Sequence, residues 1–153
     1  MVKVLFKKLD PSVETPTYKT IGASGMDLMA FIKKPIKLAA KNSCLVPTGL
    51  SVAFSSEYEI QIRPRSGLAI KNNISVLNTP GTIDSDYRGE IKIILFNHGD
   101  KDFIINHQDR IAQMVLTPIL KMELEEVDQL PDSIRGSGGF GSTGKWKIFL
   151  IKI

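Results

Sequence analysis

Short segments in which apolar and polar residues alternate recur along the chain. Residues 59–63 and 90–93 alternate at every position, which is typical of strands with one buried face. Residues 103–105 and the mainly apolar run 111–120 are further predicted strands. Turn-forming Asn, Asp, Gly and Pro residues separate these segments. Strands this short and frequent predict an all-β fold, either a sandwich, a barrel or a jelly roll.

The rest of the pattern predicts one short helix and an unusual C-terminal region. The helix is expected over residues 66–71, and we expect a single β domain over residues 1–134. Five of the 12 glycines lie in residues 135–144, so composition alone allows a mobile arm or a phosphate-binding loop there. Residues 145–153 are mostly apolar, and we hypothesise that they dock as an added strand or packed segment.

Composition narrows the class of protein. The chain has 153 residues, 42% of them hydrophobic, which is enough for one ordinary domain with a core. It has no apolar run of about 20 residues and no signal-peptide pattern at its start, so we expect a cytoplasmic protein without a membrane partner. Cys44 is the only cysteine, which excludes an intrachain disulfide, and its apolar neighbours predict a buried, unreactive thiol.

The net charge of +4 raises the question of a nucleic-acid partner. Lysines are scattered along the chain without a long cluster, which favours a solvated surface over a nucleic-acid groove. The five arginines, in contrast, all lie in or beside polar, glycine-bearing segments. A rigid guanidinium suits bidentate binding of phosphate or pairing with a carboxylate, and both uses remain open at this point.

Five such polar segments interrupt the strands: residues 24–28, 64–68, 81–89, 110–113 and 135–144. In this order they resemble the five sequence motifs of the homotrimeric dUTPases, over residues 22–144. The resemblance implies a distorted jelly-roll or barrel-like β domain, a homotrimer with sites shared between subunits, and hydrolysis of dUTP to dUMP and pyrophosphate. This reaction lowers dUTP and supplies dUMP for thymidylate synthesis. Two alternatives are dCTP deaminase, which shares the fold, and a nucleotide-binding module without catalysis.

Asp84 is the expected catalytic residue. Hydrolysis requires a water to attack the α-phosphate, and a carboxylate that orients and deprotonates this water suits the task. The resemblance gives this part to the first aspartate of the third motif, which matches Asp84. On the residues alone, Asp84 and Asp86 are equally readable as turn residues.

The remaining substrate contacts are also implied by the resemblance. Tyr87 lies under the deoxyribose and leaves no room for a 2′-hydroxyl, the hairpin before it reads uracil, and Phe140 covers the base. Arginine, glutamine, hydroxyl and main-chain groups bind the phosphates. The expected contacts are Arg65, Ser66, Gly67, Asn78, Thr82, Ile83, Tyr87, Lys92, Gln113, Arg135, Phe140, Gly141, Ser142 and Thr143.

Magnesium is the implied cofactor, because it bridges phosphate oxygens and offsets their charge. We expect no protein cage for it: the substrate phosphates and water hold it, and His98 and His107 are expected at the surface. Arg110 is expected to pair with a carboxylate such as Asp27. Gln108 stands where the fourth motif commonly has glycine, which bears on turn geometry.

Overall fold

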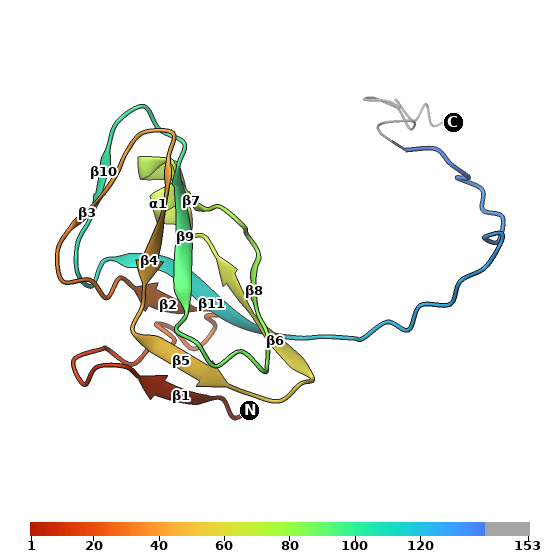
Figure 1. The fold of residues 1–153 in the computed structure, drawn as a ribbon, viewed down its shortest axis with the longest axis horizontal. Coiled ribbons are helices and arrows are strands. Elements are labelled where there is room, and N and C mark those ends of the chain that lie inside the picture. The colour runs from red at the N-terminus through yellow and green to blue at the C-terminus, as the bar shows by residue number, and fades with distance from the viewer. Residues whose placement is uncertain (140–153) are drawn as a thin grey trace, which may run out of the picture. The chain divides into compact units, whose positions relative to one another are not determined.

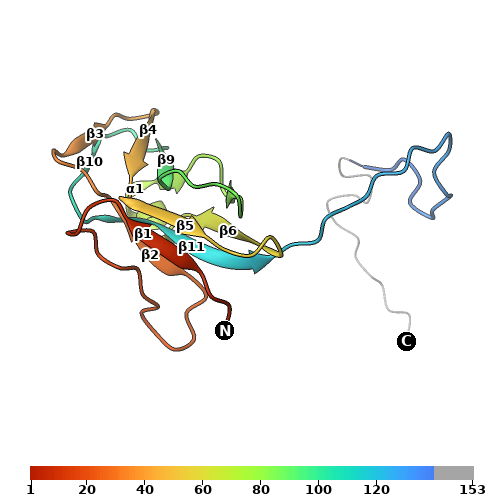
Figure 2. The ribbon, with the colours of Figure 1, turned by 60° about the horizontal axis from the view of Figure 1, so that its bottom comes forward.

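The computed structural model describes residues 1–139, in which all regular elements but one short helix are strands (Figures 1 and 2). A four-stranded antiparallel sheet has the order β2 (Met26–Met29), β11 (Arg110–Pro118), β6 (Tyr58–Arg63) and β8 (Gly81–Ile83). A three-stranded antiparallel sheet has the order β4 (Ser43–Pro47), β9 (Lys92–Asn97) and β7 (Ile74–Val76).

Two strand pairs and one helix complete the described elements. β1 (Leu5–Lys8) pairs with β5 (Leu50–Ala53), and β10 (Phe103–Ile105) pairs with β3 (Ile36–Leu38), both antiparallel. The helix α1 (Ser66–Asn72) follows the end of β6. The helix ends at Asn73, which has a left-handed φ of 57° and donates its N–H to the carbonyl of Ala69.

These elements confirm most of the sequence pattern. The strand predicted over residues 59–63 is β6, residues 103–105 are β10, and the run 111–120 contains most of β11. The alternation at 90–93 correctly indicated a buried face, since Ile91 and Ile93 are buried, but the ladder of β9 begins only at Lys92.

The core is built from the inward face of each strand. In β6 the isoleucines are buried, while Glu59, Gln61 and Arg63 lie on the opposite face, as a period of two requires. The core side chains that are almost completely buried are Leu28, Leu38, Val46, Ile74, Val76, Ile91, Ile93, Leu95, Ile105 and Ile111.

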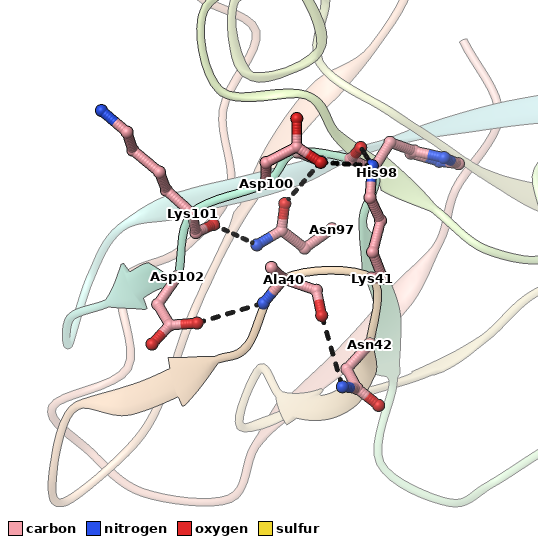
Figure 3. Close-up of polar contacts among 9 residues, drawn as sticks. Ala40, Lys41, Asn42, Asn97, His98, Asp100, Lys101 and Asp102 are labelled. Carbon is pink, nitrogen blue, oxygen red and sulfur yellow. Dashed lines mark hydrogen bonds and ion pairs between the residues drawn. The ribbon is translucent and has the colours of Figure 1, made fainter.

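One buried polar side chain, Asn97 at the end of β9, fixes a group of turns (Figure 3). Its amide nitrogen donates to the carbonyls of Leu38 (3.2 Å) and Lys101 (2.8 Å), and its oxygen accepts the N–H of Gly99 (2.9 Å). Because every polar atom of this side chain has a partner, the buried amide carries little of the usual desolvation cost. Asn97 therefore ties the end of β3 to the turn between β9 and β10.

His98 and His107 are exposed, as expected. Cys44 was expected to be buried but is half-buried. Its partial burial raises the pKa of the thiol, so less of it is the reactive thiolate at neutral pH. Among residues 1–139, no helix is long and apolar enough to cross a membrane.

The chain divides into two compact units, Met1–Leu120 and a second unit that begins at Lys121. Residues 121–139 of the second unit contain neither helix nor strand. Several large apolar side chains of this unit are exposed, among them Leu124, Leu130 and Ile134. The division of the chain at residues 134 and 144 stays a prediction.

Candidate active site

Arg65, Ser66 and Gly67 lie where β6 ends and α1 begins. Ser66 and Gly67 are exposed, and a side chain added at Gly67 would meet open space. Arg65, the residue before the helix, offers no side-chain cap to the first N–H groups of α1. These N–H groups are therefore free to bind an acceptor from outside the helix.

Asp27 on β2 pairs with two arginines. Its carboxylate accepts from Nε of Arg65 at 2.9 Å and from Nη1 of Arg110 at 3.2 Å, which confirms the expected Arg110–Asp27 pair. Arg65 also donates from Nη1 to the carbonyl oxygen of Arg110 at 3.0 Å. The side chains of Asp27 and Arg65 are 16% and 25% exposed, so this ion pair is partly shielded from water and fixes the guanidinium of Arg65.

Gln113 on β11 is held beside the same group. Its Nε2 donates to the carbonyl of Pro64 at 3.0 Å. Gly25 makes room for it, because a Cβ at Gly25 would lie 2.6 Å from Oε1 of Gln113. The structure thus brings together Arg65, Ser66, Gly67 and Gln113, which we call the α1 group.

The other expected contacts lie in residues 78–92. The predicted hairpin is not found as a pair of neighbouring strands among the described residues, because β8 pairs with β6, whereas β9, which begins at Lys92, pairs with β4 and β7. Asp84 follows β8 directly, is exposed, and accepts the N–H of Tyr87 at its carbonyl at 3.1 Å. Nη1 of Arg88 donates to the carbonyls of Ser85 and Tyr87, at 2.6 and 2.9 Å, which closes the turn. We call the expected contacts on this segment the hairpin group: Asn78, Thr82, Ile83, Asp84, Tyr87 and Lys92.

Within one chain the strand register places Asp84 and Arg65 at opposite ends of β6. Ile83 pairs with Ile60 near the start of β6, and Asp84 continues away from it. Arg65 follows the opposite end of β6 (Figure 1). At about 3.3 Å per strand residue, the five steps from Ile60 to Arg65 place Asp84 and Arg65 roughly 15–20 Å apart.

Comparison with known proteins decides what this arrangement is. The sequence model of the dUTPase family matches residues 12–144. The chain is 51% identical over 140 residues to the deoxyuridine 5′-triphosphate nucleotidohydrolase of Treponema denticola, covering 92% of this chain and 97% of that relative. This chain belongs to the dUTPase family. It is an enzyme that hydrolyses dUTP, as the five motifs predicted.

Solved structures of the family confirm the jelly-roll-like β fold. A point mutant of the dUTPase of Staphylococcus bacteriophage 80alpha, solved with dUpNHpp, has a TM-score of 0.82 at 23% identity and covers 93% of this chain and 98% of its own. A point mutant of the dUTPase of phage phi11 of S. aureus has a TM-score of 0.76 at 19% identity, over 85% and 99% of the two chains.

The fifth motif is described only in part. Arg135 is exposed in the second unit, and its Nε donates to the carbonyl of Gly138 at 2.7 Å. Phe140, Gly141, Ser142, Thr143 and the extension 145–153 lie outside the described residues. Their expected roles stay predictions.

The sequence reasoning missed two features of this enzyme. It assigned Arg65 to phosphate without its partner Asp27, although the aspartate stands in the first motif. It also gave no role to the glycines that flank the candidate contacts, Gly25 beside Gln113 and Gly89 beside Tyr87. Glycine within the motifs was the available signal, but the residue that each one accommodates depends on the fold.

Proposed function

We propose that Asp84 is the general base of dUTP hydrolysis. Its carboxylate is exposed and makes no hydrogen bond to any described residue, so it is free to accept a proton from water. The oxygen of this water attacks the α-phosphorus, the bond from that phosphorus to the bridging oxygen breaks, and pyrophosphate leaves with the bond electrons. The products are dUMP and pyrophosphate, and Asp84 holds the proton until solvent removes it.

The hairpin group binds the nucleoside in this proposal. Asn78 is exposed beside Gly81, where a Cβ would come within 3.0 Å of the Asn78 amide, so this side chain lies against the strand that follows. Main-chain groups of Thr82 and Ile83 and the main chain of Lys92 complete the recognition of uracil. Tyr87 faces the sugar and excludes a 2′-hydroxyl.

The α1 group and the C-terminal arm bind the triphosphate. Arg65 is supported for this role by its fixed guanidinium and Gln113 by its fixed amide. The free N–H groups after Ser66 add main-chain donors. Arg135, Ser142 and Thr143 bind the phosphates from the arm, where Gly141 allows close approach and Phe140 covers the uracil.

The separation of Asp84 from Arg65 is the observation that carries the rest of the proposal, a homotrimer with shared sites. Because these two residues of one chain lie roughly 15–20 Å apart, a complete site takes them from different subunits. The exposed apolar side chains of residues 121–134 support this assembly, since they offer surface for a neighbouring subunit.

Magnesium is the proposed cofactor. Residues 1–139 contain no group of three or more His, Cys, Asp or Glu side chains suited to a metal, and both carboxylate oxygens of Asp27 are used by arginines. This donor set fits an ion held mainly by the substrate phosphates and water, as Mg²⁺ prefers. When bound, the ion would offset phosphate charge. The phage phi11 dUTPase coordinates a structural Mg(II) ion. A cytoplasmic location stays our expectation.

Mixing two inactive variants tests the shared site. Asp84→Asn damages the hairpin group, and Arg65→Ala damages the α1 group. After joint unfolding and refolding, a site with an intact hairpin group from one subunit and an intact α1 group from another forms with a probability of about one quarter in a cyclic assembly. Recovery of roughly a quarter of the wild-type pyrophosphate release is expected. Failure to recover activity, with trimers formed, would show that each site lies within one chain.

A further inference from the structure

The ring of Tyr87 rests on the backbone of Gly89. We propose that Gly89 is a specificity-determining position, because the absence of a side chain there lets Tyr87 adopt the place from which it excludes ribonucleotides. This inference rests on the sugar-facing role proposed for Tyr87. It adds a positioning residue that touches no substrate.

The contact between the two residues is close. A Cβ added at Gly89 would come 2.5 Å from Cζ and 2.9 Å from Cε2 of Tyr87, with the phenol oxygen nearer still. Real Cβ atoms do not come this close to carbon, so any other residue at position 89 displaces the ring. Of the described glycines, only Gly89 has an aromatic hydroxyl against it.

A hydrogen bond fixes the ring from its other end. The Tyr87 hydroxyl donates to the carbonyl of Glu90 at 2.9 Å. That carbonyl is itself immobile, because the Glu90 carboxylate accepts the N–H of Gly49 (2.8 Å) and Ile91 donates its N–H to Leu50 (2.7 Å). The ring therefore has two supports, the surface of Gly89 and a carbonyl anchored to the start of β5.

The backbone at Gly89 has no need of glycine for its own conformation. Gly49 and Gly136 have positive φ angles among the described glycines, and Gly89 does not. Gly89 is also exposed, so a methyl group there buries nothing and strains no core contact. The space that glycine leaves is thus explained by the Tyr87 ring, and alanine at this position is compatible with the fold.

Displacing the ring has a defined chemical consequence. Tyr87 is 44% exposed, so its ring has solvent to move into when a methyl group takes its place. The gap left behind accommodates one extra hydroxyl, and a pocket without a tight wall rejects an added hydroxyl poorly. Gly89→Ala should therefore improve the use of UTP more than it harms the use of dUTP.

The experiment measures kcat/KM for dUTP and for UTP in the wild type, Gly89→Ala, Tyr87→Ala and the double variant. Gly89→Ala should lower the dUTP-to-UTP ratio by about tenfold or more, chiefly through a lower KM for UTP, with a near-normal kcat for dUTP. In the Tyr87→Ala background the same change should have no further effect, because the ring is already absent. Gly22→Ala is the matched control, since a Cβ at Gly22 meets nothing within 4 Å.

The outcomes separate the two ideas. If Tyr87→Ala leaves the ratio unchanged, Tyr87 does not face the sugar and the proposed role of that residue fails. If Tyr87→Ala lowers the ratio and Gly89→Ala does not, Tyr87 stands and the role of Gly89 is overturned. An equal loss from Gly89→Ala with and without the tyrosine ring would also overturn it, because the glycine would then act independently of Tyr87.

Discussion

Individual side chains of this enzyme are held by partners that are distant in sequence. Asp27 lies 38 residues before Arg65 and 83 before Arg110, yet it binds both. Such a carboxylate makes the two arginines less repulsive to each other and leaves Arg65 with a single orientation. The type of residue needed at these positions is visible in the motifs. The Arg110–Asp27 pair could be expected from the motifs, but the second partner of Asp27, Arg65, could not, because it follows from the turn after β6.

Asp84→Asn should reduce kcat by about 100- to 10,000-fold, because an amide has the shape of the carboxylate but is not a base. Binding of dUTP should remain, as measured by titration with a non-hydrolysable analogue. Asp86→Asn is the control, since Asp86 is an exposed carboxylate of the same turn and should retain most of the turnover. If Asp84→Asn kept more than about a tenth of the turnover, Asp84 would not be the base.

Gln108→Gly should stabilise the protein. Gln108 has a φ of 65°, in the left-handed region that costs a side-chain-bearing residue about 1–2 kcal/mol. Glycine removes this strain but loses more entropy on folding, so the net gain should be about 0.5–1 kcal/mol. Thermal unfolding at one fixed subunit concentration measures it, and Gln108→Ala, which keeps the strain, should show no gain. A lower melting temperature for the glycine variant would contradict this account.

The strands show what sequence periodicity detects and what it does not. β6 was predicted because one face is buried and the other is not. β9 is the central strand of its sheet, so its run Ile93-Ile94-Leu95-Phe96 does not alternate and gives no clear period. β2 overlaps the first motif, which was described from the sequence as a polar interruption between strands. The register that places Asp84 and Arg65 at opposite ends of β6 is a property of paired strands, and no single segment of the sequence contains it.

Asn97→Ala should destabilise the end of the domain where β3, β9 and β10 meet. The change leaves the carbonyls of Leu38 and Lys101 and the N–H of Gly99 without this partner, and an unsatisfied buried group costs about 1–3 kcal/mol. A total loss of about 2–4 kcal/mol is expected in thermal or urea unfolding. Asn42→Ala removes only one long, exposed hydrogen bond (3.4 Å) and should change stability by less than about 0.5 kcal/mol. Equal effects of the two changes would remove Asn97 from this role.

The C-terminal arm should act on the substrate more than on assembly. A chain that ends before Arg135 should lose nearly all activity, because Arg135 and the motif that follows are absent. A chain that ends at Gly144 should keep the arm but show a higher KM for dUTP, since the apolar extension would no longer limit the freedom of the arm. Steady-state kinetics on the two truncated forms measures both effects. Identical kinetics for the full chain and the form ending at Gly144 would make the extension incidental.

The whole molecule is expected to be a trimer, because the proposed site takes residues from different subunits. Light scattering should give about three times the 16.9 kDa mass of one chain. Dilution below the dissociation constant of the trimer should then abolish activity together with the trimer. A monomer with full activity would contradict both the assembly and the shared site.

The register of β8 on β6 also has a genetic consequence. Under the shared site that we propose, a defective hairpin group on one chain harms a site whose α1 group belongs to a neighbouring chain. The intact α1 group of the defective chain still serves another site. In a cell with two alleles, a lesion in one group on one allele would inactivate about half of the sites, because each site uses that group from a single chain. Two different lesions carried on separate alleles would retain some active sites, whereas each allele alone would retain none. The activity of this enzyme would therefore depend on which pairs of chains assemble, and not on each chain alone.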